Sequence, residues 1–147
     1  MASTYTSLHY HLVFSTKERR RWILPVWKTR LMDYLGGIVR DLEGVPNEIN
    51  GTNDHIHLLV SLKPTHQLSD VLRQIKGGSS GWVHAEIGQK EFAWQDGYGA
   101  FTVSPTQMAG VRKYIQKQEA HHDSKTFKEE YIELLKMSGV KYDGKYL

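Results

Sequence analysis

The first regular pattern along the chain is an alternation of side-chain types between residues 6 and 14. A period of two places successive side chains on opposite faces, as in a β-strand that buries one face against a core. The pattern therefore predicts a strand over this segment. Its core face would carry Thr6, Leu8, Tyr10, Leu12 and Phe14, and its other face Ser7, His9, His11 and Val13.

A longer period follows between Pro25 and Gly44, where apolar side chains recur every three or four residues. This spacing is typical of an amphipathic helix, and proline suits the first turn of a helix as glycine suits its end. We predict a helix here, weakened by Gly36 and Gly37. Its apolar positions are Trp27, Leu31, Tyr34, Leu35, Ile38 and Leu42.

Two short strand-like runs, 45–50 and 55–62, come next. The four residues that separate them, Gly51-Thr52-Asn53-Asp54, are of types that favour a tight turn. Two strands joined by such a turn form a hairpin. The sequence therefore predicts a β-hairpin over residues 45–62.

The segment from Leu68 to Ile75 returns to helical spacing. The glycine and serine residues at 77–81 are expected to interrupt or loosen this helix, because glycine is a poor helix former. Further along, residues 98–103 have the pattern of another strand.

Two more helices are predicted after this strand. Residues 104–107, Ser-Pro-Thr-Gln, combine a capping serine, proline at the first helical position and glutamine three residues after the cap. The helix that begins there would run towards His121, with Met108, Val111 and Ile115 on its core side. A second capping box, Thr126-Phe127-Lys128-Glu129, opens a helix that would end at Gly139. That helix would bury Phe127, Tyr131, Leu134 and Leu135.

The order of predicted elements is strand, helix, strand, strand, helix, strand, followed by two helices. The first six elements match a ferredoxin-like α+β sandwich, a central antiparallel sheet with helices on one face. We expect residues 1–147 to form a single domain, because the length suits one hydrophobic core. In this topology the first and third strands are neighbours. His9 and His11 would then lie near His55 and His57, on the sheet face that the two crossover helices leave open.

The composition narrows the chemistry that the chain can perform. The absence of cysteine excludes disulfides, thiolate metal sites and cysteine nucleophiles. No apolar run approaches the roughly 18 residues of a membrane span, and we expect a soluble, cytoplasmic protein. The net charge of +3 is mildly basic. Lys17, Arg19, Arg20 and Arg21 gather just after the first predicted strand, where they form either a solvated loop or a phosphate-binding one.

The sharpest candidate for a binding site is the triplet His55-Ile56-His57. Alternate residues of a strand share a face, so the two imidazoles lie about 7 Å apart along the backbone and can converge on one cation. The same spacing recurs at His9 and His11. Spacing alone therefore does not separate a metal site from a pair of surface or polar-core histidines at either position.

Tyr114 is a candidate nucleophile in the helix that follows residue 104. Gln118 lies one turn later on the same helix face, and a neutral amide oxygen can serve as a metal ligand. A tyrosine is a weak nucleophile at neutral pH, because its pKa is ordinarily near 10, so attack on a phosphodiester requires a cation beside the phosphate. The tyrosine and a metal site would need each other. Otherwise Tyr114 is an ordinary surface tyrosine.

Several blocks of sequence, in this order, resemble the single-tyrosine HUH transposases of small insertion sequences and the related repeat-associated tyrosine transposases. The resemblance spans nearly the whole chain. The blocks are Tyr10-His11-Leu12-Val13-Phe14, Thr16-Lys17-Glu18-Arg19-Arg20, residues 53–60 (NDHIHLLV), residues 75–80 (IKGGSS), residues 94–101 (WQDGYGAF) and residues 111–118 (VRKYIQKQ).

The resemblance implies a role for each candidate residue. His55 and His57 would be the metal-binding histidines, Tyr114 the nucleophile, and Gln118 the residue that completes the site for Mg²⁺ or Mn²⁺. His11 and His9 would not bind the metal themselves, and either would at most hold a metal ligand in its orientation. Contacts to DNA would come from the basic loop and from residues near the active site, namely Lys17, Arg19, Arg20, Arg21, Lys76, Arg112 and Lys113.

The function implied by the resemblance is single-stranded DNA transposition. Tyr114 would cut a strand near a hairpin, form a 5′-phosphotyrosine link and later rejoin the strand, and the protein would act as a homodimer. Two alternatives stay open. One is a nucleic-acid-binding module of the same fold that no longer cuts DNA. The other is a metal-dependent hydrolase, which no nearby pair of carboxylates in the sequence supports.

Overall fold

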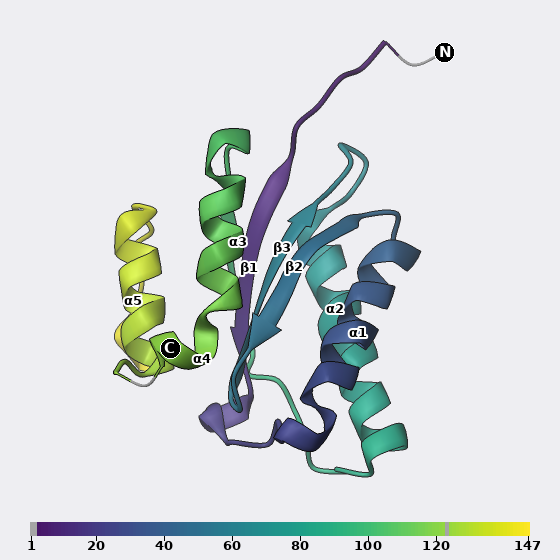
Figure 1. The fold of residues 1–147 in the computed structure, drawn as a ribbon, viewed down its shortest axis with the longest axis vertical. Helices are drawn as coiled ribbons and strands as arrows, with labels where there is room; N and C mark the ends of the chain where they lie inside the picture. The colour runs from purple at the N-terminus through teal and green to yellow at the C-terminus, as the bar shows by residue number, and fades with distance from the viewer. Residues whose placement is uncertain (1–2, 123) are drawn as a thin grey trace.

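Four antiparallel strands form the central sheet of the computed structural model, which describes residues 3–122 and 124–147 (Figure 1). The strands are β1 (His9–Ser15), β2 (Val45–Gly51), β3 (His55–Ser61) and β4 (Gly99–Thr102), in the order β2-β3-β1-β4. Helix α1 (Pro25–Asp41) connects β1 to β2, and α2 (Leu68–Trp82) lies between β3 and β4. This is the ferredoxin-like α+β architecture predicted from the sequence, with β1 and β3 adjacent at the centre.

The main hydrophobic core lies between the sheet and the pair α1 and α2, which cover one face (Figure 1). Leu12 and Phe14 of β1 point into this core, as the alternation predicted, although β1 begins at His9 and residues 6–8 precede it. The largest fully buried apolar side chains of this core are Leu12, Phe14, Ile23, Leu31, Leu35, Ile56, Leu58, Leu72, Ile75 and Phe92.

The C-terminal helices cover the opposite face of the sheet (Figure 1). They are α3 (Met108–Gln116), the single turn α4 (Gln118–His121) and α5 (Phe127–Met137). Val13 of β1 packs with Phe127 and Leu135 of α5, whereas Leu59 of β3 packs with Ile115 of α3. The sheet face that was expected to stay open is therefore buried beneath these three helices.

Helix α2 runs unbroken through the glycine and serine residues, so the expected interruption at 77–81 is wrong. Ser79 donates a hydrogen bond to the carbonyl of Ile75 (2.7 Å) and accepts one from the indole of Trp94 (2.9 Å), which ties the segment to the core. At Gly78 a Cβ would lie only 3.1 Å from Ile38 of α1, so glycine permits the close packing of the two helices. Tertiary packing here outweighs the low helix propensity.

The two predicted helix starts differ in detail. A 3-10 turn (Pro105–Gln107) precedes α3, and the Ser104 side chain makes no capping bond. A bend at Lys117 ends α3 and begins α4, where a single helix towards His121 was predicted. The capping box of α5 is confirmed, because Thr126 and Glu129 exchange the expected pair of hydrogen bonds. Among the described residues, the structure contains no helix that is both long and apolar enough to span a membrane.

Candidate metal and nucleophile site

The two histidines of β3 lie side by side on the sheet face beneath α3–α5. His55 and His57 pair across the sheet with Ser15 and Val13, and neither imidazole is exposed to solvent. Both Nε2 atoms point at one oxygen of Glu130, with distances of 3.5 Å from His55 and 3.0 Å from His57. The strand thus presents two imidazole nitrogens to a single point, the geometry that their spacing indicated.

Hydrogen bonds behind each imidazole fix its orientation. Nδ1 of His55 lies 2.7 Å from the Asp54 carboxylate and 3.0 Å from the Thr52 hydroxyl. Nδ1 of His57 shares a hydrogen bond of 2.7 Å with Nε2 of His11, whose ring stacks on that of His57. These contacts hold both Nε2 atoms towards the interior of the site.

His11 and His9, which share one face of β1, have different surroundings. Burial is the main reason that the pKa of His11 falls to about 3, and the nearby His57 lowers it further, so His11 is neutral at physiological pH. His9 instead uses its two ring nitrogens on Ser61 (2.6 Å) and Ser7 (2.9 Å). Only His11 therefore contacts the histidine pair.

Gln118, the first residue of α4, is fully buried against the histidine pair. Its Oε1 lies 2.9 Å from Nε2 of His55, and its Nε2 donates to Glu130 at 3.0 Å. The bend at Lys117 leads the chain from α3 into this position. The structure thus brings together the three residues that the resemblance grouped as metal ligands.

Tyr114 reaches the same point from α3. Its hydroxyl donates a hydrogen bond to the Glu130 carboxylate, and its ring meets those of His57 and His121 edge-on. Burial raises the pKa of Tyr114, and the hydrogen bond and negative charge of Glu130 raise it further. The phenol is therefore held in its protonated form beside the paired histidines.

Glu130 is a member of the site that was not predicted from the sequence. Its side chain, on α5, is only 1% exposed and contacts His57, His122, Gln118 and Tyr114. Burial favours the protonated acid, but hydrogen bonds from His122 and His57 outweigh it and hold the Glu130 pKa well below its usual range. The sequence does carry a signal, because Glu130 occupies the apolar face of α5 between Phe127 and Leu134. An acidic residue at such a position needs buried partners.

The donor atoms around His55 suit a cation. Because Nδ1 of His55 faces the Asp54 carboxylate, that nitrogen carries the proton and Nε2 carries a lone pair. This lone pair points at the amide oxygen of Gln118, which is also an acceptor. If the Gln118 amide were rotated by 180°, its oxygen would instead face the Glu130 carboxylate, which is also an acceptor. A proton or a metal ion between these atoms resolves the conflict, and nitrogen with carboxylate and amide oxygens is a donor set that divalent metals accept.

A second combination of ligand atoms exists in the same cluster. Within the part of the chain that the structure describes, His55, His122 and Glu130 each offer one ligand atom within 4.8 Å of the others. Burial lowers the pKa of His122, but the hydrogen bond and charge of Glu130 outweigh this, so that the pKa is raised. His122 is therefore a neighbour of the candidate cation that the sequence analysis did not single out.

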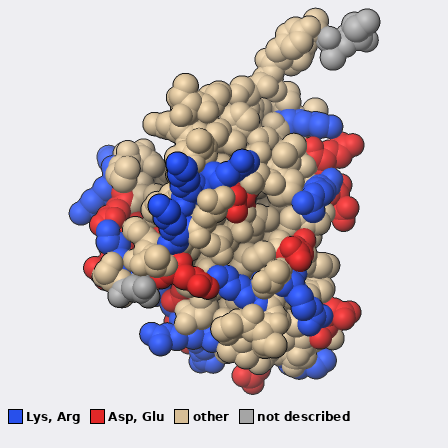
Figure 2. Space-filling view, viewed as in Figure 1, with Lys and Arg blue, Asp and Glu red and all other residues tan. Residues whose placement is uncertain are grey.

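The predicted DNA contacts fall into three places. Arg19 and Arg21 line a cleft of about 970 Å³ that also reaches Asp54 and His122, whereas Lys17 and Arg20 are exposed on the turn and Arg20 pairs with Glu18. Arg112 and Lys113 are exposed on α3, and Figure 2 shows basic side chains gathered over that helix. Lys76 points elsewhere, because its ammonium donates to the carbonyls of Gln95 and Gly97.

The fold and the site together define an α+β protein with a buried histidine pair on a central strand. A tyrosine and a glutamine amide on the consecutive helices α3 and α4 lie beside that pair. Residues 4–118 match the family described as "Transposase IS200 like". The chain therefore belongs to the family of IS200-like transposases.

Relatives and solved structures agree with this assignment. The chain is 29% identical to "ISDra2 transposase TnpA" of Deinococcus radiodurans, over 76% of this chain and 84% of that protein. It is 30% identical to "Transposase for insertion sequence element IS200" of Salmonella typhimurium, over 80% and 81%.

Two solved structures share the fold. A crystal structure of a putative transposase from Deinococcus radiodurans has a TM-score of 0.66 and 26% identity, and the match covers 80% of this chain and 95% of that one. A REP-associated tyrosine transposase bound to a REP hairpin has a TM-score of 0.62 at 19% identity, covering 83% and 73%.

Proposed function

We propose that this transposase cuts and rejoins single-stranded DNA through a covalent link to Tyr114. The observation that supports this most is the convergence of the Tyr114 hydroxyl, the Gln118 amide and the Nε2 atoms of His55 and His57 around one buried point. The nucleophile and the candidate metal ligands come from separate elements of the fold. They lie close enough for one phosphate to contact the nucleophile and a metal held by these ligands.

The reaction would exchange one phosphodiester for another. The phenol oxygen of Tyr114 attacks the phosphorus, the bond from phosphorus to the 3′ oxygen breaks, and the DNA is left with a 5′-phosphotyrosine link. The proton lost by the phenol balances the one gained by the departing 3′-OH. Because the link conserves the phosphodiester, a later 3′-OH can reverse the attack and join strands without another energy source.

His55, His57 and Gln118 would hold a Mg²⁺ or Mn²⁺ ion. Such an ion, when bound, polarises the phosphate oxygens and stabilises the charge that develops on them. Imidazole ligands suit Mn²⁺ better than Mg²⁺, which prefers oxygen. Asp54 and His11 hold the two imidazoles in the orientation that such binding requires.

The DNA substrate would be a single strand near a hairpin, and the protein would act as a homodimer. Support for the hairpin comes from a structural neighbour whose title describes it as bound to one. The strand would enter through the cleft described above, where Lys28, Lys125 and Lys128 join Arg19 and Arg21. These five basic side chains outnumber the three carboxylates of the same lining, which belong to Asp54, Glu119 and Glu129, and the excess of positive charge favours a phosphate backbone.

Incubation with a single-stranded hairpin oligonucleotide labelled at its 3′ end, the end that the 5′-phosphotyrosine link would retain on the protein, and Mn²⁺ tests this function. We expect a labelled product that remains attached to the protein after denaturation and that does not form in EDTA. Cleavage without any attached product would instead support a hydrolase. Binding without cleavage would support the alternative of a nucleic-acid-binding module of the same fold.

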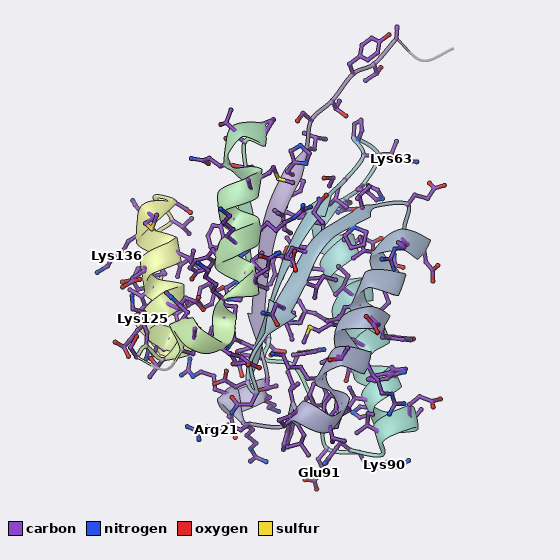
Figure 3. The ribbon with its side chains drawn as sticks, in the orientation of Figure 1. Arg21, Lys63, Lys90, Glu91, Lys125 and Lys136 are labelled. Atoms are coloured by element: carbon purple, nitrogen blue, oxygen red, sulfur yellow. The ribbon has the colours of Figure 1, made fainter. Side chains whose placement is uncertain are left out.

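A separate prediction concerns the affinity of the cleft for single-stranded DNA. Arg21→Ala and Lys125→Ala should each weaken single-strand binding and lower the slope of log affinity against log salt by about 0.7, since each removes one phosphate contact. Lys63→Ala is the control, because Figure 3 places Lys63 at the end of the molecule opposite to Arg21. Binding measured by fluorescence anisotropy at several salt concentrations gives the slopes. Equal slopes for all three variants and the wild type would exclude the cleft as the binding surface.

A further inference from the structure

Glu130 occupies the place where a cation shared by the two histidines would bind. One of its carboxylate oxygens is 3.0 Å from Nε2 of His57 and 3.5 Å from Nε2 of His55. The other accepts from Gln118 at 3.0 Å and from the Tyr114 hydroxyl. A carboxylate is the hard oxygen donor that Mg²⁺ and Mn²⁺ prefer, so the group that faces both imidazoles is also of the type that binds these ions best.

The position of Glu130 follows from the way α5 docks. The capping box of Thr126 and Glu129 fixes where the helix begins, and the ring of Phe127 stacks on that of His55 with centroids 4.3 Å apart. Glu130 comes three residues after Phe127, slightly less than one helical turn, so both side chains point to the same face of α5. This segment lies beyond residue 118, where the family match ends.

The surroundings of Glu130 contain a further donor atom for a cation. Nε2 of His122 lies 2.9 Å from the same carboxylate oxygen that faces His55 and His57, so three imidazole nitrogens surround that oxygen. Imidazole nitrogen and carboxylate oxygen together form a donor set that divalent metals accept.

We propose that Glu130 is itself a ligand of the cation, together with His55 and His57. This inference rests on the proposed metal-assisted function and extends it to a residue outside the family match. Glu130 then has two roles. Without the cation it holds the Tyr114 hydroxyl, and as a ligand it releases that hydroxyl, which becomes available to a phosphate.

Mn²⁺ titration of the full chain without DNA tests the proposal, with free Mn²⁺ measured by electron paramagnetic resonance. We expect Glu130→Gln to weaken Mn²⁺ binding on the order of 100-fold, at the upper end of the roughly 10- to 100-fold losses seen for residues that only orient ligands. Glu133→Gln, which alters an exposed carboxylate on the same helix, should bind like the wild type. A folded Glu130→Gln protein with wild-type affinity would overturn the proposal.

A second variant covers the case in which Glu130→Gln does not fold. Tyr114→Phe leaves the carboxylate in place and removes a hydrogen bond that competes for it. We expect its Mn²⁺ affinity to rise several-fold, and an affinity that stays equal or falls would contradict the proposal. Because no DNA is present, these results are independent of whether the wild type cleaves DNA, so failure of the proposed strand transfer is detected separately.

Discussion

Replacing Tyr114 with phenylalanine is expected to reduce strand cleavage by at least ~10³-fold, because the variant lacks the attacking oxygen and water can replace it only poorly. The ring should keep its edge-on contacts with His57 and His121, so the fold should be retained. Single-turnover cleavage of a labelled hairpin oligonucleotide with saturating Mn²⁺ measures the effect.

Tyr131→Phe is the matched control for this experiment. Tyr131 is also half-buried on the sheet face covered by the C-terminal helices, and it packs on Phe127. Unlike the Tyr114 hydroxyl, the Tyr131 hydroxyl does not donate a hydrogen bond to Glu130. We expect wild-type cleavage from this variant. If instead Tyr114→Phe cleaved at the wild-type rate, another group would be the nucleophile.

His57→Ala should lower Mn²⁺-dependent cleavage by a similar factor. A cation that stabilises charge on the phosphate contributes several kcal/mol, and each ~1.4 kcal/mol is a factor of ten, so losing the ligand costs about 10³-fold. The substitution also removes the hydrogen bond from Nε2 to Glu130 and the contact with His11. Cleavage rates measured across a range of Mn²⁺ concentrations show whether high metal restores activity.

His9→Ala provides the comparison on the neighbouring strand. His9 belongs to a triplet of the same His-x-His spacing, but its bonds go to Ser7 and Ser61. We therefore expect little change in the metal dependence of cleavage. A loss in His9→Ala equal to that in His57→Ala would contradict the assignment of the metal site to His55 and His57, because it would indicate that the two histidine pairs share one function. Circular dichroism of both variants separates a lost ligand from a lost fold.

Much of the fold could be predicted because local pattern and tertiary structure agree. The alternation around Leu12 and Phe14, and the hairpin turn at residues 51–54, specify strands that the sheet then uses. The exception at residues 77–81 has a specific cause. The contacts of Gly78 with Ile38 and of Ser79 with Trp94 come from distant parts of the chain, and no local propensity contains them.

The candidate site could be predicted only in part for a similar reason. Strand periodicity places His55 and His57 on one face, and helical periodicity places Tyr114 near Gln118. The choice of these residues over His9 and His11 needed the family resemblance, since the spacing is the same. Glu130 was missed because its role depends on the docking of α5 over the histidines, which neither the capping box nor the spacing in α5 specifies.

The buried state of the site also follows from this docking. The histidines are covered by Phe127, Gln118 and Glu130 of their own chain, and Tyr114 belongs to the same cover. A phosphate can therefore reach the histidines only if part of α3–α5 shifts. The cleft described above adjoins this cover, because two of its lining residues, Asp54 and His122, contact His55 and Glu130.

Mass spectrometry of the covalent protein–DNA product tests the central claim most directly. The product formed with Mn²⁺ is digested with protease and nuclease, and the residue that carries the remaining nucleotide is located by fragmentation. The chain has eight tyrosines, and we predict that the nucleotide is attached through a 5′ phosphate to Tyr114. A nucleotide found on any other residue would contradict the assignment of Tyr114 as the nucleophile.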